Sequence, residues 1–155
     1  MKKKNIKKED GMVEDQPELK KTGKKVDYFY AVGRRKTATA RVRLYLKPGP
    51  IVVNDKPIEQ YFPLETQKRT YFAPFRITDT LEKYSANIRV NGSGKTGQLG
   101  AVVHGLARAL AFADREKFRP QLKKYSFLTR DQRMKERRKF GLAHKARAKK
   151  QSPKR

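Results

Sequence analysis

Hydrophobic and polar residues alternate strictly from Ala38 to Leu46, with apolar side chains at every even position. The residues between them are Thr39, Arg41, Arg43 and Tyr45. Successive side chains of a β-strand point to opposite faces of its sheet. The pattern therefore predicts a strand with one face in a core and a basic face turned outward.

Shorter apolar runs on either side of this segment predict the rest of a sheet. The expected strands are 28–32, 38–46, 51–53, 75–77 and 87–90. Residues 33–36 would link the first two strands, Lys47–Pro50 (KPGP) and Asn54–Asp55 would form turns, and 80–84 would be turn or helix.

One long helix is predicted from about Gln98 to Phe112. Its apolar residues recur at three- and four-residue spacing and are Leu99, Val103, Leu106, Leu110 and Ala113. Small residues on its other surfaces would allow a sheet to approach closely; these are Gly100, Ala101, Ala107 and Ala111. Shorter helices are expected at 57–62, 65–71 and 115–125, the last shortened or kinked by Pro120.

Strands and helices mixed within one compact unit predict an α+β fold, a single small domain in which helices pack a mixed sheet. We expect this domain to span residues 28–127. Residues 1–27 mix lysines with acids, show no periodicity and are predicted to be a disordered extension. Residues 128–155 form a long basic C-terminal tail.

The net charge of the chain limits the classes of function that it can have. The chain has 40 Lys and Arg against 15 Asp and Glu, a net charge of +25. Repulsion on this scale opposes compactness unless a polyanion neutralises it, so a nucleic-acid partner is predicted. No segment has the ~18–20 apolar residues of a membrane-spanning helix, so no membrane partner is expected.

The composition also argues against metal and cofactor chemistry. The chain has no Cys, and its only imidazoles are His104 and His144, so no metal site and no cofactor are predicted. No carboxylate pair or nucleophile–base arrangement indicates catalysis, so we predict that the protein is not an enzyme. The N-terminus lacks the apolar region of a secretory signal.

The stretch Gly92–Gln98 (GSGKTGQ) lies between a predicted strand and the long helix, where nucleotide-binding loops occur. Such a loop requires G-x-x-x-x-G-K-[ST], but the position of its first glycine is Arg89. A nucleoside-triphosphatase is therefore disfavoured. Two interpretations remain: a simple chain reversal, or backbone amides and Lys95 that meet a nucleic-acid phosphate. The net charge favours the second.

Further cations gather in two places. Arg34, Arg35 and Lys36 lie on a predicted loop beside Arg41 and Arg43, where like charges repel one another unless an anion lies among them. A solvated basic loop is the simpler alternative. Tyr28, Tyr30 and Tyr45 nearby are candidates for stacking on bases, although strand aromatics more often form core or cross-strand pairs.

The second group follows residue 128. A short helix is expected from Thr129 to Gly141, docked on a partner because too few apolar residues exist to bury it. Ordering residues 143–155 costs about 13–26 kcal/mol of backbone entropy, which only a polyanion would offset. The RNA-binding cations predicted here are Arg130, Arg133, Arg137, Arg138, Lys139, Lys145, Arg147, Lys149 and Lys150.

Three motifs then resemble a known family in the right order. They are YAVGRRKTATARV at 30–42, GSGKTGQ at 92–98 with HGLARAL at 104–110, and LTRD at 128–131 with ERRK at 136–139 and the terminal Lys154–Arg155. The chain from about residue 28 to its end resembles the universal ribosomal small-subunit protein nine family, bacterial type.

The resemblance implies an α+β domain in the head of the small ribosomal subunit, bound to ribosomal RNA and beside neighbouring ribosomal proteins of the head. It implies that Arg34, Arg35, Lys36, Lys95, Arg108 and the cations of 130–150 hold ribosomal RNA. It also implies a tail that reaches the P-site tRNA, with Lys154 and Arg155 as the tRNA-contacting pair. The location would be the ribosome of the cytoplasm, or of an organelle.

Two departures from the family pattern stand out. Ser93 occupies the middle of what is a glycine triplet in the family, and Ser152–Pro153 precedes the terminal pair where the family usually has an aromatic residue and a serine. An alternative function with the same charge is a non-specific DNA-compacting protein. That alternative does not explain an ordered domain followed by a basic tail.

Overall fold

The computed structural model describes residues 28–142 and 146–147. Within them one mixed sheet has the strand order β1-β2-β5-β3-β4. The strands are β1 Tyr28–Arg35, β2 Ala38–Tyr45, β3 Ile51–Val53, β4 Lys56–Pro57 and β5 Ser85–Asn91. β3 runs parallel to β5, and the other pairs are antiparallel. The helices are α1 Ile58–Tyr61, α2 Glu65–Ile77, α3 Lys95–Ala113 and α4 Phe118–Lys124. The predicted α+β fold with a mixed sheet is confirmed.

The alternation along β2 has the predicted consequence. Ala38, Ala40, Val42 and Leu44 are all buried, and Arg41 and Arg43 are exposed. The expectation that Leu46 joins the core is wrong, since its side chain is 54% exposed. β2 ends at Tyr45, just before the turn residues, so the alternation no longer fixes which way the next side chain points.

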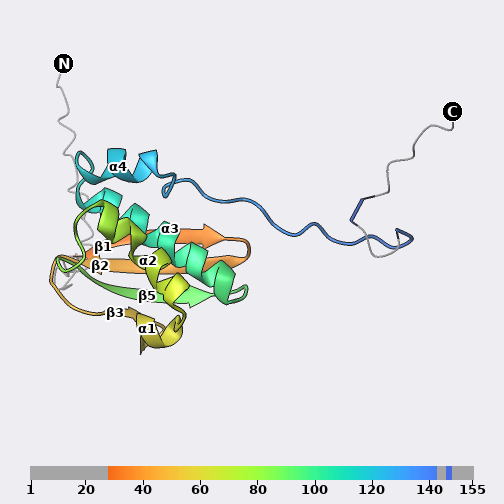
Figure 1. The fold of residues 1–155 in the computed structure, drawn as a ribbon, viewed down its shortest axis with the longest axis horizontal. Coiled ribbons are helices and arrows are strands. Elements are labelled where there is room, and N and C mark those ends of the chain that lie inside the picture. Colours follow the sequence, from red (N-terminus) through yellow and green to blue (C-terminus); the bar gives the residue numbers. More distant parts are fainter. Residues whose placement is uncertain (1–27, 143–145, 148–155) are drawn as a thin grey trace, which may run out of the picture.

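Helix α3 covers one face of the sheet and forms the centre of the core (Figure 1). Leu106 and Leu110 are fully buried, and the small residues Ala101, Ala107 and Ala111 are buried as well, whereas Gly100 is only partly buried. Helices α2 and α4 pack against α3. Among the described residues, no helix covers the opposite face of β1, β2 and β5.

The strand predicted at 75–77 is wrong, because these residues form the last turn of α2. Tyr71, Pro74 and Phe75 are buried together, which is the i, i+3, i+4 spacing of one helical face. A window of three residues is too short to show that period. Residues 80–84 were expected to be turn or helix, and the structure has a turn at 81–83.

The short helix expected from Thr129 to Gly141 is also wrong. Residues 130–139 are neither helix nor strand, and Figure 1 shows this segment leading away from the domain. Met134 is 57% exposed and Phe140 is fully exposed, so no apolar face is available to pack a helix. A helix here would also place Arg133 and Arg137 at i, i+4 spacing, where like charges are destabilising.

Candidate nucleic-acid interface

The uncovered side of the sheet carries a basic surface, which we call the open sheet face. Strand alternation and register assign to it the outward residues of three strands. They are Tyr28, Tyr30, Val32 and Arg34 of β1, Thr39, Arg41, Arg43 and Tyr45 of β2, and Ser85, Asn87, Arg89 and Asn91 of β5. None of these residues is acidic.

Arg41 of β2 lies directly opposite Arg89 of β5 in the antiparallel register. Both are exposed. Like charges directly opposite each other on a sheet are destabilising. Within the described chain neither arginine takes part in an ion pair. The open sheet face therefore carries a repulsion that a bound anion would remove.

Two hollows lie on this face and share Arg41 and Arg89. The first, of about 690 Å³, extends toward the β1–β2 turn and is lined in part by Arg34, Thr39 and Asn91. The second, of about 410 Å³, is lined by Tyr28, Tyr30, Arg41, Arg43, Asn87 and Arg89. Both volumes fall in the range of about 300–1,000 Å³ that is common for ligand sites.

The structure divides the predicted cluster at 34–36 between two sites. Arg34 and Arg35 belong to β1, and the connecting turn is only Lys36–Thr37, where Lys36 has a φ of 51°. Arg34 lines the larger hollow of the open sheet face. The side chain of Arg35 instead lies against Gly100 of α3 and pairs with Asp131. The interpretation of these cations as one loop is thus corrected by the alternation of the strand.

The segment after α4 is tied to the domain at Asp131. Its carboxylate forms an ion pair with Arg35, and it accepts further hydrogen bonds from the Arg133 backbone and guanidinium at 2.9 Å. These donors hold the pKa of Asp131 well below its usual range, Arg133 having the largest effect. Phe127 and Leu128 pack against the core just before this point. The start of the basic tail is therefore fixed to the domain.

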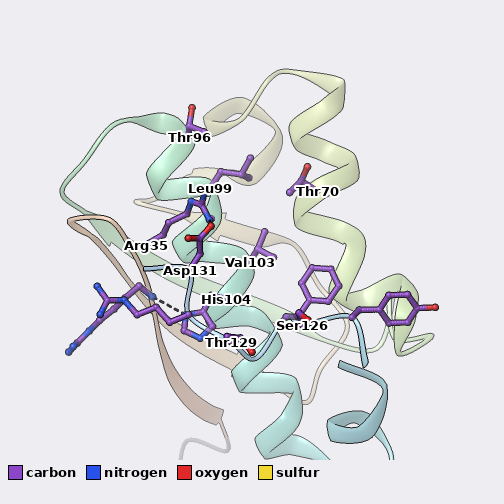
Figure 2. Close-up of a pocket in the computed structure, with 14 residues that line it drawn as sticks. Arg35, Thr70, Thr96, Leu99, Val103, His104, Ser126, Thr129 and Asp131 are labelled. Atoms are coloured by element: carbon purple, nitrogen blue, oxygen red, sulfur yellow. Dashed lines mark hydrogen bonds and ion pairs between the residues drawn. The ribbon is translucent and has the colours of Figure 1, made fainter. Parts of the chain in front are cut away.

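A cavity of about 520 Å³ lies beside this attachment, between β1, α2, α3 and the segment after α4 (Figure 2). Leu99 and Val103 of α3 give it an apolar wall, and Arg35 and Asp131 meet at its edge. The cavity lies at the junction where the tail leaves the domain.

His104 and Arg108 of α3 bond to the free edge of β1. The backbone N–H of Arg34 donates to His104 Nδ1 at 3.2 Å, and the Arg108 guanidinium donates to the Val32 carbonyl. Burial lowers the pKa of His104, and the charge of Arg108 lowers it further. A neutral imidazole is required for Nδ1 to accept this hydrogen bond. These two side chains satisfy strand groups that would otherwise be exposed.

The glycine-rich stretch is a strand-to-helix turn. Gly92 and Ser93 have φ values of 80° and 52°, and Gly94 is the N-cap of α3. Lys95 and Thr96 thus lie in the first helical turn, whose amides have no intrahelical partner. The ammonium of Lys95 lies 3.5 Å from the Tyr61 ring centroid, folded toward α1. Ser93, at the family's glycine position, adopts the left-handed conformation that glycine favours.

The remaining predicted cations lie along the tail. Arg130, Arg133, Arg137 and Arg138 are exposed. Lys139 and Arg147 both pair with Glu136, at 2.7 and 2.9 Å, and this lowers the pKa of Glu136. Lys145, Lys149, Lys150, Lys154 and Arg155 lie outside the described residues, as do residues 1–27 and His144.

Sequence reasoning missed Arg89 and Asn87 as members of the basic surface. The signal was present, because residues 85–91 alternate in the same way as β2, with Ala86, Ile88 and Val90 buried. The apolar run was recognised as a strand, but its outward residues were not added to those of β2. Pairing β5 directly with β2 is what joins the two rows.

The described part of the chain contains no group of three or more His, Cys, Asp or Glu residues that could hold a metal ion. Over the same residues, no helix has the length and hydrophobicity needed to cross a membrane.

The chain also matches a model of a known protein family. The model of the family described as ribosomal protein S9/S16 matches residues 33–155, which include both the open sheet face of β2 and β5 and the tail. Members of this family are structural proteins of the small ribosomal subunit that bind ribosomal RNA, not enzymes. The chain therefore belongs to the ribosomal protein S9/S16 family and is a component of the ribosome that binds ribosomal RNA together with other ribosomal proteins.

Proposed function

We propose that the protein is of the bacterial type, sits in the head of the small subunit and uses its basic tail to reach the P-site tRNA. In this proposal the domain holds ribosomal RNA through cations that the structure leaves exposed, which are Arg34, Lys36, Arg41, Arg43 and Lys95. The cations of residues 130–150 contact ribosomal RNA between the domain and the end of the tail, and Lys154 and Arg155 contact the tRNA. Arg35 and Arg108 act within the chain, by fixing the tail and the edge of β1.

The observation that carries the proposal is the attachment at Asp131. The ion pair with Arg35 fixes where the chain leaves the domain, and the next residues form no helix or strand. An extended chain spans at most about 3.3–3.6 Å per residue. Residues 132–155 therefore have a contour length of roughly 80 Å at full extension. The ion pair between Arg147 and Glu136 shortens the path between those two residues, and the remaining length still extends well beyond the domain.

The chemistry of the tail supports an RNA target for its whole length. Residues 119–155 carry 15 Lys and Arg against two acids. Both acids, Asp131 and Glu136, are neutralised by ion pairs within the chain. Contacts from Lys and Arg to phosphates position a protein on RNA without reading its sequence. A tail of this kind would contact the phosphate backbone of the tRNA, whichever tRNA is bound.

The test is removal of residues 152–155 from the chain in assembled small subunits. We expect assembly to proceed and the affinity for P-site tRNA to fall. The double variant Lys154→Gln/Arg155→Gln should reproduce the loss, whereas Lys149→Gln/Lys150→Gln, with the same change in charge, should affect P-site tRNA less. Unchanged tRNA affinity after the truncation would refute the role of the tail end.

Location in the small subunit is tested separately. Ribosomal subunits from the source cells are sedimented through high salt, and each fraction is analysed by mass spectrometry. We expect the chain to stay with the small subunit after the wash. Release with the loosely held proteins would contradict an integral place in the head.

A further inference from the structure

A surface that binds phosphates alone would use only the hydroxyls of its tyrosines and would leave their rings exposed. Tyr30 is 49% exposed and Tyr28 is 38% exposed. Tyr28 is already engaged, because its ring lies 5.8 Å from that of Tyr45 and the Arg43 guanidinium lies 5.6 Å from its centroid. No such partner is found for the ring of Tyr30 among the described residues.

The surroundings of Tyr30 combine three chemistries. Arg43 lies directly opposite it in the β1–β2 register, and Asn87 lies opposite Arg43 on β5. The same hollow of about 410 Å³ also includes the opposed pair Arg41 and Arg89. A flat apolar ring, an amide that can both donate and accept, and two cations that form no ion pair within the described residues are thus gathered on one face of the sheet.

We propose that this hollow binds an unpaired nucleotide of RNA, with its base stacked on Tyr30 and its phosphates held by Arg41 and Arg89. The inference rests on the RNA-binding function proposed for the domain and specifies the kind of RNA that the open sheet face binds. A bound nucleotide removes two unfavourable features of this surface, the exposed ring of Tyr30 and the repulsion between Arg41 and Arg89. Its base covers the exposed ring, and its phosphate neutralises the opposed arginines.

Unpaired RNA suits this site better than a duplex. The bases of an A-form helix are stacked on one another, and its accessible surface is phosphate and 2′-hydroxyl. A duplex would therefore neutralise the arginines but leave the Tyr30 ring uncovered. Bases of single strands and loops can be splayed out onto aromatic side chains, and sheets that carry exposed aromatics commonly bind RNA in this way.

The experiment compares the affinity of the full chain for a short single-stranded RNA and for an RNA duplex of the same length. Base–aromatic stacking contributes about 1–3 kcal/mol, so Tyr30→Leu should weaken single-strand binding by about 5- to 150-fold. Duplex binding should change little. Tyr30→Phe should keep near-normal affinity for the single strand. Tyr125→Leu is the matched control, because Tyr125 is 58% exposed but follows α4, away from this face.

A spectroscopic readout separates stacking from loss of fold. The chain has no Trp, so a Tyr30→Trp variant carries one reporter on the face, and a Tyr125→Trp variant carries one away from it. We expect single-stranded RNA to quench the fluorescence of the first variant and not that of the second. Circular dichroism should show that each variant keeps the secondary structure of the unsubstituted chain.

Two results would overturn the inference without touching the proposed role of the tail, which depends on residues 152–155. One is unchanged single-strand affinity of Tyr30→Leu while Arg41→Gln weakens both RNAs, which would mean that the face binds phosphates alone. The other is unchanged RNA affinity of Tyr30→Leu together with loss of a neighbouring ribosomal protein from the subunit. That result would mark the face as a protein contact.

Discussion

Gly33 of β1 and Gly105 of α3 meet backbone to backbone. A Cβ on Gly33 would lie 2.3 Å from the Gly105 nitrogen and 1.9 Å from the carbonyl oxygen of Ala101. A Cβ on Gly105 would in turn lie 2.7 Å from Val42 Cγ2. This approach places α3 close enough for His104 and Arg108 to bond to the edge of β1. The close approach therefore joins helix α3 of the core to β1, the strand whose two faces carry Arg34 and Arg35.

Gly33→Ala should destabilise the protein strongly, because the added methyl group meets backbone atoms that cannot rotate away. Overpacking of this kind typically costs about 1–3 kcal/mol, and we expect a value near 3 kcal/mol or above. Urea unfolding followed by circular dichroism measures the change. Gly94→Ala is the control, since no atom lies within 4 Å of a Cβ there. A Gly33→Ala variant as stable as the Gly94→Ala variant would contradict the close approach.

His104 should make stability depend on pH. Its pKa is lowered in the folded state by burial and by Arg108. The unfolded chain, with a His pKa of about 6.5, therefore binds more protons as the pH falls through that region. By linkage, the free energy of unfolding is highest above pH ~7 and falls as the pH drops below ~6.5.

The measurement is the free energy of unfolding of the chain between pH 7.5 and 5.5, above the range in which most carboxylates titrate. His104→Gln retains a side-chain acceptor and should flatten the profile. His144→Gln, which changes the only other imidazole of the chain, should leave the slope in place. A slope that persists in His104→Gln and vanishes in His144→Gln would show that His144 causes the pH dependence, and this would contradict the prediction.

Asp131→Asn should loosen the attachment of the tail. The amide cannot form the ion pair with Arg35, and one of its two terminal atoms no longer accepts a hydrogen bond from Arg133. Trypsin should then cut after Arg130 severalfold faster, while cleavage after Arg137, further along the tail, serves as the internal reference. Glu136→Gln makes the same charge change but breaks pairs with Lys139 and Arg147 only. Equal cleavage ratios in the two variants would show that Asp131 does not hold the tail.

The sequence predicts those parts of the fold whose period repeats long enough to be read. β2 alternates over its whole length, and α3 repeats its apolar spacing over several turns, so both were predicted close to their observed bounds. The last turn of α2 was predicted as a strand, because Phe75–Ile77 alone shows no helical period. Residues 130–139 have helix-forming composition, but no apolar face exists to fix a helix in place.

The sequence predicts only part of the candidate site, for a related reason. Arg41 and Arg43 could be assigned to an outward face from β2 alone, whereas Arg89 joined them only once β5 was known to pair with β2. Sequence neighbours were also misleading: Arg34 and Arg35 are predicted to lie on one loop, but both belong to β1, whose alternation turns their side chains to opposite faces. The pairing of Asp131 with Arg35 spans the whole domain and has no local pattern that predicts it.

Arg89→Gln should lower the salt dependence of RNA binding. If Arg89 contacts a phosphate, its loss removes one released counterion, and the slope of log K against log salt concentration should fall in magnitude by about 1. Affinity should weaken by a similar factor for single strands of different sequence, because a phosphate contact reads no base. The measurement is the affinity of the full chain for ribosomal RNA fragments across a series of salt concentrations.

Arg76→Gln is the matched control, with the same charge change at an exposed position of α2, which packs against α3 and so lies on the covered side of the sheet. It should leave the slope nearly unchanged. Because Arg41 lies opposite Arg89, Arg89→Gln also relieves a repulsion in the free protein and should raise its stability by about 0.2–1 kcal/mol. Weaker binding with greater stability is the combination that identifies Arg89 as a binding residue. A variant that binds as tightly as before and with the same slope would remove Arg89 from the interface.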